Sequence, residues 1–175
     1  MNLVTQPDTD ALIVRALGDF CTRFLRAPGA DAAPLVVRGY VNRVSSPAGP
    51  DYVLITPLAM TRLATNRHAW DAEPGVASVI QPTRRRVQLD CYGASAAPWA
   101  KTLTTLLRDP IGADFLAPYG IAPLSCEDPQ DLTQAEGDEQ WLPRFMVQVF
   151  LQVNDVTAVG LDFFTDVNLQ LHPKP

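Results

Sequence analysis

The sequence has few of the residues that build catalytic and metal sites. Its 175 residues include two histidines and three cysteines, and Cys21, Cys91 and Cys126 stand far apart with no C-x-x-C pair among them. A disulfide framework needs an even set of spaced cysteines, and a structural zinc site needs clustered cysteine and histidine ligands. We therefore expect three buried free thiols, and neither a disulfide framework nor a zinc site.

Long apolar runs are also missing. No stretch reaches the roughly 18 apolar residues that span a bilayer, and residues 1–10 hold two acidic and no basic side chains. A secretory signal starts with basic residues and continues into an apolar segment. The sequence therefore predicts no membrane partner and favours a cytosolic product.

No pattern typical of an enzyme is present. His68 lies in a polar stretch and His172 beside the last prolines, and neither has the serine, cysteine or aspartate neighbours of a nucleophile–base pair. The sequence also lacks a glycine-rich phosphate loop. We predict that the protein is not an enzyme and binds no cofactor. The alternative from this class is a small hydrolase that uses Asp90 and His68.

One acidic stretch, CEDPQDLTQAEGDEQ, offers candidate ligands for a divalent cation. Glu127, Asp128 and Asp131 lie within it. The stretch lacks the alternating spacing and the closing glutamate of a calcium loop. A solvated loop without a metal is therefore the favoured interpretation.

The composition is that of one folded domain. Hydrophobic residues make up 47% and charged residues 19% of the chain, which is typical of a globular protein with a core of its own. We predict a single domain over residues 1–175, with a long β-hairpin at 58–92 and a C-terminal strand and tail at 154–175.

Charge is distributed unevenly along the chain. Residues 1–108 hold twelve basic and eight acidic side chains, a balance of +4, whereas residues 109–175 hold two basic and eleven acidic ones, a balance of −9. The eight charged side chains between Asp109 and Pro143 are all acidic. Such a division indicates either two differently solvated faces or complementary contacts between copies of the chain.

Hydrophobic periodicity separates helices from strands. A helical stripe runs through residues 8–27, where Asp8 or Thr9 can cap the start, and another runs through residues 95–109. A short turn of helix is expected at 111–116. Strands are expected at residues 34–39, 51–56, 58–70, 75–93, 141–154 and 164–173. This order predicts an α+β fold, a mainly antiparallel sheet with two helices packed on one face.

The run Arg84 to Arg86 lies in one of these strands. Because side chains alternate across a strand, Arg84 and Arg86 should share one face and Arg85 should take the other. Three arginines in a chain with a net charge of −5 are weak grounds for nucleic-acid affinity.

Four long segments resemble the phage neck terminator family, tail-terminator-like proteins of tailed phages. They are VVRGYVNRVSSPAGPDYVLITPLAMTRLATN, IQPTRRRVQLDCYG, LLRDPIGADFLAPYGIAPLSCEDPQ and WLPRFMVQVFLQVN. The resemblance covers roughly Leu35 to Val153. It implies a tail-terminator-like fold. Independently, the low apolar content near Thr65 to Glu73 predicts that the long hairpin projects from the sheet.

The resemblance also implies a structural role at the head–tail junction of a virion. Proteins of this kind form homo-oligomeric rings, commonly hexamers, that terminate the tail tube and dock it to the head. The implied partners are a neck or head-completion protein on one side and the tail tube protein on the other. Double-stranded DNA would pass through the lumen without sequence-specific binding, and assembly would occur in the host cytoplasm. The alternative is another ring component, a head-completion or tail-tube subunit.

On this interpretation, polar residues on or beside the strands are candidates for contacts between subunits or rings. They are Arg38, Asn42, Arg43, Arg62, Asn66, Arg67, Arg84 and Arg86. Arginine is suited to them because its planar guanidinium pairs bidentately with carboxylates. The alternative is that half of them solvate the sheet or pair within the chain. Trp70, Trp99 and Trp141 are expected as core or interface anchors, with the core favoured for Trp99.

Overall fold

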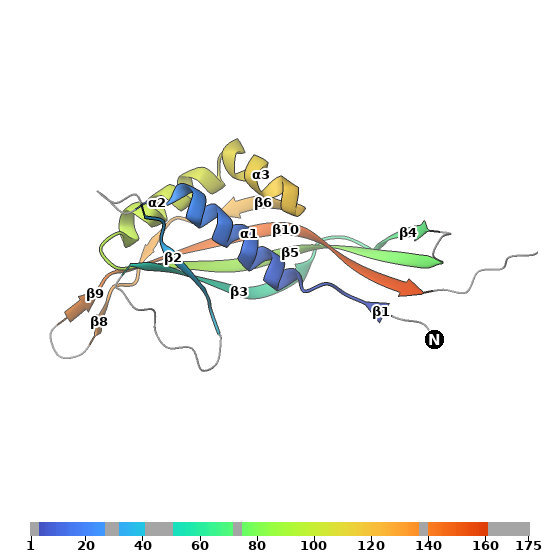
Figure 1. Cartoon of the computed structure of the whole chain (residues 1–175), viewed down its shortest axis with the longest axis horizontal. Coiled ribbons are helices and arrows are strands. Elements are labelled where there is room, and N and C mark those ends of the chain that lie inside the picture. The colour runs from blue at the N-terminus through green and yellow to red at the C-terminus, as the bar shows by residue number, and fades with distance from the viewer. Residues whose placement is uncertain (1–3, 27–31, 41–50, 72–74, 137–139, 161–175) are drawn as a thin grey trace, which may run out of the picture.

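The computed structural model describes five stretches of the chain. They are residues 4–26, 32–40, 51–71, 75–136 and 140–160. The fold is a long, curled sheet with helices over part of one face (Figure 1). Of the interface candidates, Asn42 and Arg43 lie outside the described residues, as does the part of the predicted C-terminal strand and tail beyond Gly160.

Two long strands form the spine of the sheet. β5 (Val76–Tyr92) and β10 (Arg144–Gly160) each have 17 residues. They pair antiparallel without a register break, from Arg144 opposite Tyr92 to Gly160 opposite Val76. At about 3.3 Å per residue the pair is roughly 56 Å long. Five of the other described strands pair directly with this ladder.

The inner part of the ladder consists of residues 83–92 of β5 and 144–153 of β10. Together with the elements that flank it, it is termed the body. β3 (Tyr52–Arg62) pairs with residues 83–92 of β5, and β2 (Leu35–Arg38) adds to β3 in parallel. β6 (Ile121–Cys126) and β7 (Gln130–Asp131) pair with the other edge of β10. A separate two-stranded sheet pairs β8 (Gln134–Glu136) with β9 (Gln140–Leu142).

The outer part of the ladder, residues 76–82 of β5 and 154–160 of β10, is termed the arm together with its flanking strands. β4 (Arg67–Asp71) pairs with residues 76–80 of β5, and β1 (Val4–Thr5) pairs with the end of β10. Figure 1 shows these four strands extending beyond the helices.

Helices cover one face of the body, which is termed the helix face of the sheet. α1 (Thr9–Phe24) packs on β2 and β3, and α2 (Ala96–Leu107) packs on β5 and β10. Asp8 caps α1 by accepting a hydrogen bond from the Ala11 amide at 3.0 Å, which satisfies one of the free amides at the helix start. Phe20 of α1 is fully buried, and such a side chain contributes about 1.5–3 kcal/mol.

A third helix, α3 (Pro110–Leu116), follows directly and is capped by Asp109. It packs closely against α2 because Gly112 has no side chain. A Cβ there would lie 2.5 Å from the Leu106 carbonyl oxygen. A 3-10 turn, η1 (Ala117–Tyr119), then leads into β6 through Gly120, whose φ of 69° favours glycine.

The core repeats the two-residue alternation of the strands. Val87 and Leu89 of β5 lie directly opposite Val149 and Val147 of β10, and all four are fully buried on the helix face. The residues between them point to the opposite side, which is termed the open face.

The predicted α+β class with a mainly antiparallel sheet is confirmed, although β2 and β3 are parallel. The expected turn of helix at 111–116 is present as α3. Cys21, Cys91 and Cys126 are buried free thiols, as predicted. Burial raises the pKa of Cys21 to about 12 and that of Cys126 to about 11. None of the described helices is long and apolar enough to cross a membrane.

The long hairpin expected within residues 58–92 is only partly present. Its first limb is divided into β3 and β4, which follow one another along the same edge of β5. Leu63 joins the two by donating its amide to the Pro82 carbonyl at 3.0 Å. The projecting element is therefore a four-stranded arm rather than a hairpin alone, because β10 and β1 continue on the other side. The strand expected at 141–154 ends too early for this, because β10 continues to Gly160.

Candidate assembly surfaces

The open face of the sheet carries exposed arginines. Arg84 and Arg86 project from β5 on this face, and the guanidinium carbon of Arg84 lies 5.1 Å from the ring centre of Phe150 on β10. Arg67 of β4 lies opposite Ile80 of β5. Ile80 is four residues before Arg84, an even number, so Ile80 and Arg67 lie on this face too. These three arginines are termed the basic surface.

The remaining interface candidates lie apart from the basic surface. Arg38 is exposed at the end of β2. Arg62 donates from Nε to the Ala64 carbonyl at 2.8 Å and from Nη2 to Oδ1 of Asn66 at 2.7 Å. Arg62 and Asn66 therefore stabilise the turn between β3 and β4. For these two residues, the structure supports the alternative that they pair within the chain.

Exposed acidic side chains gather along the opposite edge of the body. They lie on the connection into α3, on α3 itself, and around β6 and β7, and are termed the acidic edge: Asp109, Asp114, Glu127, Asp128 and Asp131. Hydrogen bonds from the hydroxyl and amide of Thr133 lower the pKa of Asp131. The basic surface and the acidic edge are thus unlike surfaces on different sides of β10.

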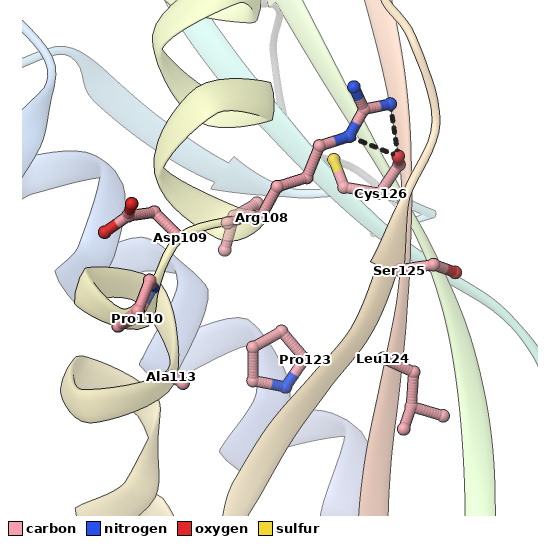
Figure 2. A pocket seen from close by; sticks show the side chains of 9 residues that line it. Arg108, Asp109, Pro110, Ala113, Pro123, Leu124, Ser125 and Cys126 are labelled. Atoms are coloured by element: carbon pink, nitrogen blue, oxygen red, sulfur yellow. Dashed lines mark hydrogen bonds between the residues drawn. The ribbon is translucent and has the colours of Figure 1, made fainter.

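A hollow of about 580 Å³ opens between the end of α2, α3 and β6 (Figure 2). Its lining residues are Leu107, Arg108, Asp109, Pro110, Ala113, Pro123, Leu124, Ser125 and Cys126. Figure 2 shows the Arg108 guanidinium turned to the Cys126 carbonyl, which accepts from Nε at 2.8 Å and from Nη2 at 2.6 Å. Nη2 also donates to Asp128 at 2.8 Å, so this cation is neutralised at the rim.

A buried ion-pair network lies where the arm leaves the body. The carboxylate of Asp155 accepts from Nη2 of Arg85 at 2.8 Å, from the Thr83 hydroxyl at 2.8 Å and from the Thr9 hydroxyl. Arg85 also reaches Asp10 of α1 at 3.1 Å. Burial alone would raise the pKa of Asp155, but the hydrogen bonds and the Arg85 charge outweigh it, so the pKa is lowered. The network joins the start of α1 to both long strands.

The sequence analysis placed Arg85 on the face opposite Arg84 and Arg86, and this alternation is confirmed. The network itself was missed. Its signal is a charged residue that continues an apolar series, because Asp155 follows Val149, Leu151 and Val153 at two-residue spacing. Such a position faces the core, where a carboxylate requires partners.

A second cluster closes the inner end of the open face. Asp90 is 1% exposed and accepts from Nε of Arg144 at 3.0 Å and from Nη2 at 2.9 Å. The Arg144 guanidinium carbon lies 5.5 Å from the Tyr92 ring centre, and Tyr92 stacks on Tyr52 at 4.5 Å. This arrangement holds β10 against β5 through charge-assisted hydrogen bonds and ring contacts.

The structure does not bring Asp90 and His68 together, as the hydrolase alternative would require. His68 lies opposite Val79 on the helix face of the arm, whereas Asp90 lies on the open face of the body. Eleven positions of β5 separate Val79 from Asp90, or roughly 36 Å. A general base and its partner need hydrogen-bond contact, so this pair cannot work as proposed.

The metal-binding alternative also finds no support in the residues that the structure describes, which contain no group of three or more possible ligands. Asp128 is engaged by Arg108, and Asp131 by Thr133.

One of the three tryptophans is buried and two are exposed. The buried one is Trp99, for which the sequence favoured the core. Trp99 is 2% exposed and donates its indole N–H to the Arg26 carbonyl at 2.8 Å. Trp70 in the arm and Trp141 in β9 are 64% and 73% exposed. Large exposed aromatic side chains on strands are typical of interface anchors.

These features, which combine unlike charged surfaces, exposed aromatic anchors and a rigid sheet, are typical of a subunit that assembles with other proteins. The chain matches the family model of the phage neck terminator protein over residues 11–174 and belongs to this family. It is therefore a structural component of a phage neck or tail. No curated protein matches the chain in sequence.

Proposed function

We propose that the chain forms a closed ring at the head–tail junction, a hexamer, which terminates the tail tube and docks it to the head. The ring is homo-oligomeric, with a neck or head-completion protein on one side and the tail tube protein on the other. The single observation that supports this best is the separation of the basic surface from the acidic edge. A closed ring joins one patch of a subunit to a different patch of the next.

Arginine and carboxylate side chains suit such a contact. Arg84 and Arg86 are exposed on a central strand, and the planar guanidinium loses less order for each hydrogen bond to a carboxylate than a lysine would. Each exposed pair contributes only about 0–1 kcal/mol. Charge therefore sets the orientation of neighbours, while apolar contacts supply most of the affinity.

The lumen of this ring passes double-stranded DNA without sequence-specific binding. The net charge of the chain is −5, which limits immobilising contacts to phosphate. We also expect no hydrolase activity and no bound cofactor, and assembly in the host cytoplasm before the head docks.

The test is the mass and symmetry of the purified protein, measured by light scattering after size exclusion and by electron microscopy. A ring with sixfold symmetry supports the proposal, and a monomer at all concentrations contradicts it. Labelling of the protein in the virion then distinguishes a tail terminator from a head-completion or tail-tube subunit. The label should lie between the tail tube and the neck.

A further inference from the structure

The helix face of the arm bears an apolar row that no described helix covers. Trp70, Ala77, Val159 and Val4 are successive partners across β4, β5, β10 and β1. In the body the same face is buried beneath α1 and α2, but in the arm Trp70 and Val4 remain 64% and 62% exposed. Directly paired residues share one face, so these four side chains form an apolar strip, termed the arm row. Its two ends, Trp70 and Val4, are exposed, whereas Val159 is half-buried and Ala77 is buried at 4% exposed.

The hollow offers a matching apolar receptor. Leu124 lines it and is 46% exposed, and Pro110 and Ala113 of α3 lie across the hollow from Pro123 of β6 (Figure 2). Leu124 is the extra residue where the pairing of β6 with β10 shifts register, between Ser125 and Pro123. Such a bulge redirects a side chain, and here it leaves a leucine open to solvent at the hollow. A volume of about 580 Å³ is within the range of sites that take a large side chain or small ligand.

The arm carries an exposed cation near the arm row, whereas the rim of the hollow is acidic. Arg67 lies three residues before Trp70 on β4 and is exposed on the open face, and the exposed His68 ring lies 6.4 Å from the indole on the helix face. Asp109 lines the hollow, and Glu127 and Asp128 follow β6 at its rim. The one described cation in the lining, Arg108, is bound to the Cys126 carbonyl and to Asp128. An approaching arm would therefore meet a net negative rim.

The arm of the same chain does not reach the hollow. The hollow lies on the body, between α3 and β6, while the arm extends away from the helices of its own chain (Figure 1). The other exposed tryptophan, Trp141, lies in the segment between Asp109 and Pro143, whose charges are all acidic. Like charges would oppose its entry, so Trp70 is the better anchor.

We propose that the arm row of one copy, with Trp70 at its end, docks in the hollow of the next copy. The inference rests on the proposed ring and specifies its apolar contact. It joins two unlike surfaces, as a head-to-tail interface requires. It also gives Trp70 a buried site in the assembly, where a tryptophan is among the strongest anchors.

Cross-linking between separately made variants tests the contact directly. His68→Cys places a thiol beside Trp70, and Leu124→Cys places one in the hollow. A short bismaleimide should yield a cross-linked dimer when the two proteins are mixed and assembled, and neither variant alone should cross-link. Thr61→Cys, exposed on the open face, is the matched control and should not cross-link to Leu124→Cys. The parent chain treated with the reagent controls for its buried native thiols.

Substitution of the anchor gives the second test. Trp70→Ala should raise the concentration needed for assembly about tenfold or more, as expected for a buried aromatic anchor. Trp141→Ala, which removes an equally exposed tryptophan, should change it less than about twofold, a size typical of surface substitutions. In a Trp141→Phe background, assembly should also shift the tryptophan emission to shorter wavelength, and a further Trp70→Phe change should remove that shift.

The outcomes separate this inference from the proposed ring. If Trp70→Ala and Trp141→Ala variants, folded by circular dichroism, assemble like the parent, then the ring stands and the docking contact is wrong. Cross-linking of His68→Cys to itself would mean that arms meet arms, which also contradicts the contact. A parent chain that stays monomeric contradicts the ring, and the contact with it.

Discussion

The body and the arm are built from the same two strands but differ in what covers them. In the body, Val87 and Leu89 of β5 are fully buried beneath helices. In the arm, Val79 continues the same alternation on the same face, yet it is only half-buried. On this face of β5, burial is complete at Val87 and Leu89 in the body and, apart from Ala77, only partial in the arm. On the proposed docking contact, the body folds on its own contacts, whereas the arm row of one copy is covered by the next.

The border between the two regions is a polar network rather than an apolar layer. Asp155, Arg85 and Asp10 meet where α1 begins and the arm departs. Their directed hydrogen bonds fix the angle of the arm more closely than apolar packing would, because such pairs require specific geometry.

Removing the charge of Asp155 should cost the most. Asp155→Asn leaves the Arg85 guanidinium with only the more exposed Asp10 as its counter-charge, and breaking a buried pair costs about 3–5 kcal/mol. The matched control is Asp10→Asn, since Asp10 is the more exposed partner at 42%, and exposed pairs are worth about 0–1 kcal/mol. Urea unfolding of both variants measures the difference. Equal losses would show that the border network has no special role.

Truncation of a core side chain should distinguish the body from the arm. Leu89→Ala should destabilise the chain by about 2–5 kcal/mol, because it leaves a cavity in a fully buried site. Val79→Ala, on the same strand and face, should cost less than about 1 kcal/mol in the free chain, since solvent already reaches it. Equal free energies of unfolding would mean that the arm belongs to the core.

The residues that share each face of the long strands could be predicted from the sequence, but the part of the face that the helices cover could not. Alternation correctly placed Phe145, Val147 and Val149 on one buried face, because a period of two is a local property of the chain. The same alternation cannot tell whether a helix covers the face. That depends on where helices of limited length are placed, which is a tertiary property. For this reason the four-stranded arm and the hollow were missed.

For the candidate assembly surfaces too, features set by local strand geometry could be predicted, and features set by tertiary packing could not. The shared face of Arg84 and Arg86 could be predicted because it depends on strand geometry alone. The pairing of Arg62 with Asn66 depends on the turn between β3 and β4, which sequence spacing did not determine. The hollow requires α2, α3 and β6 to meet, and Leu124 lines it only because of a bulge.

The border network should also make stability depend on acid. The pKa of Asp155 is lowered in the folded chain, so its ionised form favours folding. This stabilisation is fully present above the unfolded pKa of about 3.9, and it is lost as the pH falls through the lowered value. The free energy of unfolding of the parent should therefore fall more steeply below about pH 4 than that of Asp155→Asn. Parallel curves in urea titrations would argue against the assigned role of this carboxylate.

Proteolysis should be faster in the arm than in the body, and assembly should remove the difference. Trypsin should cleave the free chain after Arg67 in exposed β4 before it cleaves after Arg85 in the buried network. In the assembled particle, cleavage after Arg67 should slow because the arm is engaged. Mass spectrometry of timed digests measures both rates. A rate after Arg67 that is equal in free and assembled protein would show that the arm stays exposed.

Charge reversal should have the smallest effect per residue, and it tests whether the basic surface and the acidic edge meet in the ring. Arg84→Glu with Arg86→Glu should weaken assembly and steepen its salt dependence, since screened exposed pairs give about 0–1 kcal/mol each. Adding Glu127→Arg and Asp114→Arg, both at exposed positions, should restore part of the loss, because the coupling is pairwise. Ring formation by light scattering across a salt series is the readout, with folding checked by circular dichroism. If the folded double mutant assembles like the parent at every salt concentration, the two charged surfaces serve only solvation. The apolar contact between the arm row and the hollow would then carry the assembly, and Trp70→Ala should weaken it as much in that background as in the parent.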